Sequence, residues 1–197
     1  MISFSVPHKE SVKGFFSFGV EEGAVLFAGS RHLSIDRKTC LTLVNGLGRL
    51  GFSLMTGCAD GVDSSFRNAF SESDFKDSSL IACAFKSRYK QFKDTSFPLF
   101  VVPEGLPPKV ALAKRTLWLT NRCSILILFP SEPMGKGSAL AFKSAIMNSK
   151  PVFVAGDTRP KESCLYTVYP SSLYGTVKGF WCIPPVYQDT RLCSEAV

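Results

Sequence analysis

Between residues 23 and 155, short apolar runs of strand length alternate with longer segments whose apolar residues recur at helical spacing. Glycine, proline or polar residues bound the short runs, which are apolar throughout rather than at every second position. Such strands are typical of a parallel sheet that is buried on both faces, and parallel strands need crossover connections. The alternation therefore predicts an α/β fold, a Rossmann-like open parallel sheet flanked by helices.

The pattern also predicts how the chain is divided. Expected strands cover 23–29, 52–55, 80–85, 124–129 and 151–155, and expected helices cover 35–50, 62–70, 110–121 and 137–148. The stretch 86–108 is polar, aromatic and proline-containing, so we expect a long loop there with a short strand near 98–102. After residue 156 the pattern changes to short β-like pieces. We therefore expect an N-terminal lead-in (1–22), a Rossmann-like domain (23–156) and a short β-rich C-terminal extension (157–197) packed on the core.

Composition narrows the class of protein. A chain of 197 residues is long enough for one domain with a real core. No apolar run approaches the roughly 18 residues that span a bilayer, and the first residues do not resemble a signal peptide. The seven cysteines show no paired spacing, which predicts reduced thiols in a cytoplasmic protein without a metal or cofactor. A zinc site built from Cys164, Cys182 and Cys193 is the alternative, although structural zinc ligands usually come in pairs.

The first candidate ligand loop contains Gly29, Ser30 and Arg31, directly after the first expected strand. In open α/β sheets, ligands bind beyond the carboxyl ends of the strands. A glycine there allows close approach to the backbone, Ser30 can donate to a phosphate oxygen, and Arg31 can add a charge-assisted contact. The alternative is a tight turn with a solvated arginine.

The second candidate loop follows the second expected strand and reads Thr-Gly-Cys-Ala-Asp-Gly-Val-Asp over residues 56–63. Gly57, Ala59 and Gly61 would bring the backbone close to a ligand. Asp63 falls in the first turn of the next helix, where it could bind a sugar hydroxyl, a base edge or an arginine. The alternative is that Asp63 simply favours the helix N-terminus.

The third candidate loop lies after the strand at 124–129, where Lys136, Gly137 and Ser138 open the next helix. It is another potential anion site, although the spacing is not that of a Walker A loop. The three loops follow three strands of one predicted parallel sheet. Together with the net charge of +7, they predict a phosphate-bearing ligand at the carboxyl edge of the sheet.

The order of these motifs resembles the DprA/Smf family within the SLOG superfamily of Rossmann-like proteins. The resemblance rests on Val-Leu-Phe-Ala-Gly-Ser-Arg at 25–31, on the motif at 56–63, and on weaker matches at 103–108, 114–115, 137–138 and 150–152. It covers about residues 23–156. Cys58 stands where the family more often has glycine. The resemblance implies a site lined by Gly29, Ser30, Arg31, Gly57, Ala59, Gly61, Asp63, Arg115, Gly137 and Ser138.

Three functions follow from these features. The first is binding of a nucleotide or a nucleotide-derived ligand. The second is DprA-like binding of single-stranded DNA by a homo-oligomer, with basic side chains and with aromatic residues for base stacking: Arg31, Lys114, Arg115, Arg122, Phe85, Tyr89, Phe92 and Trp118. The third is hydrolysis of a nucleotide, with Asp63, Glu132 or His32 as acid or base. Whether the protein is an enzyme stays open, and we expect Cys58 to be a small filler residue rather than a nucleophile.

Overall fold

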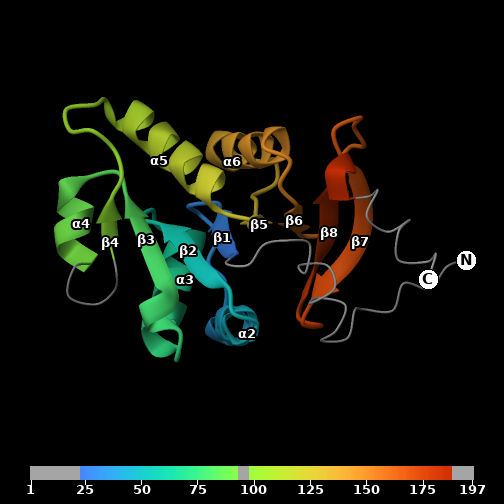
Figure 1. Ribbon diagram of the computed structural model, residues 1–197, viewed down its shortest axis with the longest axis horizontal. Coiled ribbons are helices and arrows are strands. Elements are labelled where there is room, and N and C mark those ends of the chain that lie inside the picture. Colours follow the sequence, from blue (N-terminus) through green and yellow to red (C-terminus); the bar gives the residue numbers. More distant parts are fainter. Residues whose placement is uncertain (1–22, 93–97, 188–197) are drawn as a thin grey trace, which may run out of the picture.

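The computed structural model describes residues 23–92 and 98–187. Its strands form one eight-stranded sheet in the order β4-β3-β2-β1-β5-β6-β8-β7, shown in Figure 1. Six strands pair in parallel: β1 (Ala24–Gly29), β2 (Ser53–Gly57), β3 (Ser79–Cys83), β4 (Pro98–Phe100), β5 (Ile125–Phe129) and β6 (Val152–Ala155). Strands β7 (Thr167–Leu173) and β8 (Val177–Ile183) form an antiparallel hairpin, and β8 pairs with β6. The predicted Rossmann-like sheet with a short β-rich C-terminal extension is confirmed.

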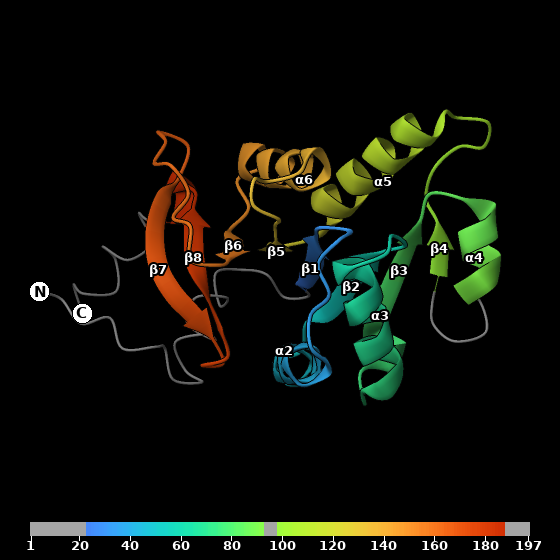
Figure 2. The same cartoon turned by 180° about the vertical axis from the view of Figure 1, so that it is seen from behind.

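Helices cover both faces of this sheet (Figures 1 and 2). Helices α2 (Arg37–Arg49) and α3 (Val62–Glu72) pack on one face, whereas α5 (Pro108–Arg122) and α6 (Lys136–Met147) pack on the other. The short helix α4 (Lys86–Phe92) lies beside β4, and 3-10 turns cover Lys76–Ser78 and Pro185–Tyr187. From β1 the chain moves outward through β2, β3 and β4 and then returns to β5. The strand order therefore reverses between β1 and β5, the position at which open α/β sheets bind ligands.

The continuous apolar runs are explained by burial on both faces. Successive side chains of a strand point to opposite sides, so Val25 and Phe27 join the core under α2 and α3, while Leu26 joins the core under α5 and α6. The Phe27 ring stacks on Phe66 of α3 with the ring centroids 4.0 Å apart. A strand with helices on both sides has no polar face, which is why its sequence does not alternate.

The boundaries of α2 follow from local chemistry. Asp36 precedes the helix, and its side chain accepts a hydrogen bond from Thr39 N at 2.9 Å. Gly51 follows the helix with a φ of +88°, a conformation that favours glycine, and this confirms the predicted end. Among the described residues no helix is long and apolar enough to cross a membrane.

The stretch expected to be a long loop contains α4 and the short strand β4. The strand was predicted, but the helix was missed because its seven residues carry no apolar stripe. Contacts distant in sequence hold α4 in place. Arg88 pairs with Asp60 at 3.3 Å, and the Arg67 guanidinium lies 4.6 Å from the centroid of the Phe92 ring.

We predict that Gly29→Ala destabilises the fold. A Cβ at this position would collide with the carbonyl oxygen of Phe129 and lie 2.7 Å from Val62 Cγ2. Because backbone cannot give way cheaply, we expect urea denaturation to show a free energy of unfolding lower by about 1–3 kcal/mol.

Gly137→Ala is the matched control, since a Cβ at Gly137 meets no atom within 4 Å. That variant should stay within about 1 kcal/mol of the wild type and on the stabilising side. Equal losses in the two variants would contradict the close packing at Gly29.

Candidate functional site

The three candidate loops meet at the carboxyl ends of β1, β2 and β5. Ser30 N donates to the Phe129 carbonyl at 2.9 Å, which joins the ends of β1 and β5. Val62 N donates to the Ser30 carbonyl at 3.1 Å, which joins the start of α3 to the first loop. The sequence therefore placed these loops at one edge correctly, and direct backbone contacts connect them.

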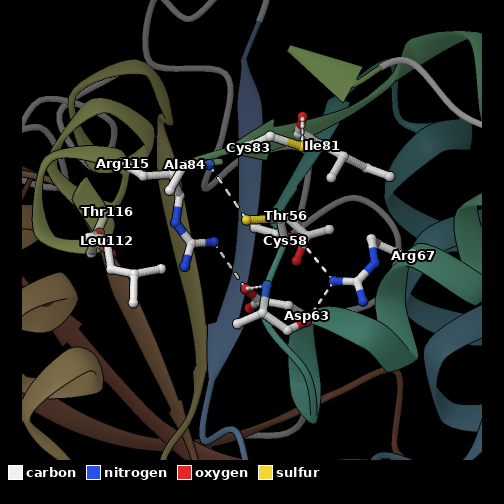
Figure 3. Close-up of polar contacts among 12 residues, drawn as sticks. Thr56, Cys58, Asp63, Arg67, Ile81, Cys83, Ala84, Leu112, Arg115 and Thr116 are labelled. Atoms are coloured by element: carbon white, nitrogen blue, oxygen red, sulfur yellow. Dashed lines mark hydrogen bonds and ion pairs between the residues drawn. The ribbon is translucent and has the colours of Figure 1, made fainter. Parts of the chain in front are cut away.

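The motif at residues 56–63 carries a buried ion pair across the end of the sheet, drawn in Figure 3. Arg115 Nη1 of α5 lies 3.0 Å from Asp63 Oδ2 of α3, and the two side chains are only 8% and 7% exposed. These helices are on opposite faces, so the pair passes the end of β2. Gly57 leaves the space for it, because a Cβ there would collide with both Arg115 Nη1 and Asp63 Oδ2.

The rest of the motif holds its own backbone. Ala59 N donates to Asp63 Oδ2 at 3.1 Å. Gly61 has a φ of +68°, and a Cβ there would collide with the Ser30 carbonyl. Arg67, which the sequence analysis missed, donates from Nη1 to the carbonyls of Gly57 at 3.1 Å and Ala59 at 2.6 Å. The sequence signal that could have pointed to Arg67 is its spacing, because a basic residue four positions after Asp63 lies one turn farther along the same helix.

These contacts change the interpretation of several candidate residues. Gly57, Gly61, Asp63 and Arg115 are brought together at the predicted edge, but their contacts are with one another and with backbone. A direct contact of these residues with a ligand stays a prediction. The role of Asp63 as an acid or base also stays a prediction. Its Oδ2 atom already accepts two hydrogen bonds, from Ala59 N and from Arg115 Nη1.

The open part of the edge lies between β1 and β5. Arg31 and Lys136 are exposed, and neither forms an ion pair with a described residue. Space for a Cβ is free at Gly137, and the nearest atom to one at Gly135 is Ser131 Oγ at 3.7 Å. The backbone here is accessible at the N-terminus of α6, a helix of 12 residues.

Two serines lie at this opening. The Ser30 hydroxyl accepts a hydrogen bond from His32 N at 3.2 Å and can still donate its own proton. Ser138, in the first turn of α6, is 6% exposed. Ser30 is likewise buried, at 8% exposed.

Other basic and aromatic candidates lie elsewhere. Lys114 of α5 is exposed, and so is Lys109 in the first turn of the same helix, at the carboxyl edge, which the sequence analysis did not single out. Arg122, by contrast, ends α5 just before β5 begins, which puts it at the opposite edge, with its guanidinium 4.0 Å from the centroid of the Trp118 ring. Phe85 and Phe92 pack against a core cluster between β3, β4 and α5. Of the four aromatic candidates, Tyr89 is the one classed as exposed, at 37%.

Cys58 has polar and charged neighbours in addition to the apolar residues that it packs against. Its Sγ accepts a hydrogen bond from Ala84 N at 3.5 Å. A hydrogen bond with Cys83 and the positive charge of Arg115 lower the pKa of the Cys58 thiol to about 6, although burial and Asp63 oppose this. The single sequence gave no signal for the pairing with Cys83.

The described part of the chain contains no group of three or more histidine, cysteine, aspartate or glutamate side chains arranged to hold a metal ion. Cys182 is buried and Cys164 is exposed. Cys193, the third residue of the alternative zinc site, lies outside the described residues.

With this geometry established, the chain was compared with known proteins. No protein-family model matches it, and no curated protein matches it in sequence. Among solved structures, it is similar to DNA processing protein A of Helicobacter pylori, whose structure is described as showing a unique mode of binding single-stranded DNA. The identity is 18%, the TM-score is 0.54, and the match covers 69% of this chain and 66% of that one.

It is also similar to DNA processing protein A (DprA) of Streptococcus pneumoniae, at 18% identity and a TM-score of 0.54, over 71% of this chain and 52% of that one. The chain thus matches about two thirds of one of these proteins and about half of the other. At this identity the likeness shows a shared fold. The Rossmann-like fold implied by the resemblance to the DprA family is confirmed.

We predict that the buried ion pair contributes strongly to stability. Arg115→Met leaves the Asp63 carboxylate buried without its cation, so we expect the free energy of unfolding to fall by about 3–5 kcal/mol. The double variant Asp63→Asn with Arg115→Met removes that charge and should recover at least about 1 kcal/mol relative to the single variant. Urea denaturation followed by circular dichroism measures both.

The control is Arg37→Met, which breaks the ion pair between Arg37 and Glu72. The two side chains are 75% and 38% exposed, respectively. Exposed pairs contribute little, so this variant should lose no more than about 1 kcal/mol. A loss in Arg115→Met as small as that in Arg37→Met would contradict the role given to the buried pair.

Proposed function

We propose that this protein binds the phosphate groups of single-stranded DNA at the carboxyl edge of its sheet, between β1 and β5. The observation that carries the proposal is a pair of exposed basic side chains, Arg31 and Lys136, at the accessible N-terminus of α6, with Lys109 farther along the same edge at the start of α5. Arg31, Lys109 and Lys136 have no ion-pair partner among the described residues, and the backbone at Gly137 is open. Unpaired cations beside free amide donors are suited to a polyanion.

The groups at this edge would act in different ways. Amide groups at the start of α6 and the hydroxyls of Ser30 and Ser138 donate hydrogen bonds to one phosphate. Arg31 adds a bidentate contact. Lys109 and Lys136 are point charges that hold neighbouring phosphates as the strand continues across the edge.

The buried ion pair supports this surface without touching the ligand. Asp63 accepts a hydrogen bond from Ala59 N, and Val62 N donates its hydrogen bond to the Ser30 carbonyl rather than to a ligand. Through these contacts the Asp63–Arg115 pair holds the second loop against the first. Asp63, Arg115, Gly57 and Gly61 are therefore positioning residues in this proposal.

Two further facts support nucleic acid. The net charge of +7 favours polyanionic ligands. The fold is shared with DNA processing protein A of H. pylori, which is described as binding single-stranded DNA. A nucleotide-derived small molecule would use the same anion site, so competition distinguishes the two ligands. Hydrolysis has less support, since Asp63 is already bound to Arg115 and Glu132 accepts a hydrogen bond from the Thr158 hydroxyl.

We predict that a fluorescently labelled single-stranded oligonucleotide binds with an affinity that falls steeply as salt rises. Arg31→Ala should raise Kd by roughly three- to tenfold and reduce the slope of log Kd against log salt by about 0.7, the value for one phosphate contact on a single strand. Fluorescence anisotropy at several salt concentrations measures both quantities.

Arg49→Ala is the matched control. It removes the same charge from an exposed position at the end of α2, just before β2 and so at the opposite edge. Its Kd should stay within about twofold of the wild type. Salt-independent binding, or equal effects of the two variants, would overturn the proposed site. Displacement of the oligonucleotide by low concentrations of a mononucleotide would favour the small-molecule ligand instead.

A further inference from the structure

Two cysteines lie side by side at the same edge of the sheet. Cys83 is the last residue of β3, and Cys58 directly follows β2. The two strands are parallel and pair Gly57 with Ala82, so Cys58 and Cys83 occupy the next position of the same register. Neighbouring strands are about 4.8 Å apart, which is within the range of Cα separations that a disulfide can bridge.

The side chains are close enough to interact. Cys58 Sγ lies 3.5 Å from Ala84 N, the residue after Cys83, and Cys83 Sγ lies 3.9 Å from the Ile81 carbonyl oxygen. Both residues belong to one buried cluster, and each thiol shifts the pKa of the other. Both are labelled in Figure 3. They are buried, with Cys58 2% and Cys83 0% exposed. A bond between them would close within the protein, and large reagents would be kept out.

The charges around the pair make the two sulfurs unequal. Cys58 is close to the cations of Arg115 and Arg67, while Asp63 is the nearby anion. The neighbouring Cys83 thiol lowers the pKa of the Cys58 thiol, while Cys58 and burial raise the pKa of Cys83, so at neutral pH Cys58 holds the thiolate and Cys83 keeps its proton. A thiolate beside a protonated partner is the arrangement of an attacking and a resolving cysteine.

Other buried cysteines lack this arrangement. Burial raises the pKa of Cys40 to about 12, of Cys123 to about 11 and of Cys182 to about 12. These thiols stay protonated at neutral pH and are poor nucleophiles. Any oxidation chemistry inside the described core is therefore concentrated at the end of β2.

We propose that Cys58 and Cys83 form an oxidation site, in which a small hydroperoxide oxidises Cys58 and Cys83 then closes an intramolecular disulfide. In the first step the Cys58 thiolate attacks a peroxide oxygen. The S–O bond forms, the O–O bond breaks, the sulfur loses two electrons to the peroxide, and the departing hydroxide (an alkoxide, if the oxidant is an alkyl hydroperoxide) takes a proton from solvent to become water or an alcohol.

In the second step the Cys83 sulfur attacks the sulfenic sulfur of Cys58. The S–S bond forms, the S–O bond breaks, and the hydroxide leaves with the Cys83 proton as a second water. No other oxidant is needed. The product is neutral, so oxidation removes a negative neighbour of Arg115, whose buried Nε has no hydrogen-bond partner among the described residues.

The test is peptide mapping by mass spectrometry after exposure of the reduced, folded protein to hydrogen peroxide. The exposed Cys164 is first replaced by serine to prevent disulfides between molecules. We expect a peptide pair joined through Cys58 and Cys83, reversed by dithiothreitol, and consumption of Cys58 at least roughly tenfold faster than that of Cys40. In Cys83→Ser, Cys58 should stop at a sulfenic acid, which dimedone traps when it is added together with denaturant after the peroxide is removed.

Cys40→Ser is the control for loss of a buried thiol, and the joined peptide should still form in it. Absence of the joined peptide in the protein that carries Cys164→Ser alone, or equal consumption of Cys58 and Cys40 there, would overturn the proposal. Because the mapping needs no folded variant at position 83, it stands even if Cys83→Ser is unstable. No nucleic acid is present, so the result is independent of the DNA-binding proposal.

Discussion

The ion pair between Asp63 and Arg115 is the interaction on which the carboxyl edge of this protein depends. It joins a helix on one face of the sheet to a helix on the other, across the end of β2. Two charges buried to this extent are costly unless each has a partner. The backbone around them is accordingly built to accept the pair: Gly57 leaves the space, and Ala59 N supplies a further hydrogen bond to the carboxylate.

This arrangement divides the edge into a closed part and an open part. At the end of β2 the motif residues satisfy one another, and Arg67 holds two of their carbonyls. Between β1 and β5, the exposed Arg31 and Lys136 flank a helix N-terminus whose glycines leave the backbone accessible. In the proposed function, the closed part would keep the open basic part in shape before a ligand arrives, which reduces the entropy lost on binding.

The closed part also creates the chemistry proposed for Cys58. The arginines that hold the loop are the cations nearest to this thiol. Parallel pairing of β2 with β3 then puts Cys83 in the next position of the register. Cys58 thereby acquires the charge environment and the neighbouring thiol on which the proposed oxidation site rests. The support of the loop and the reactivity of the thiol have the same physical origin.

The sequence by itself determined the fold class, because continuous apolar strands separated by helical patterns leave few arrangements other than a parallel sheet covered on both faces. It also placed the three loops at one edge, since all parallel strands end there. It did not reveal α4, whose stability comes from contacts with residues distant in the chain.

Nor could the sequence distinguish residues that face a ligand from residues that face each other. Asp63 and Arg115 are 52 residues apart, and Arg115 and Arg122 lie on one helix yet belong to opposite edges. Only the tertiary structure decided these roles, because burial and pairing depend on which elements are neighbours in space, and local spacing carries no record of that.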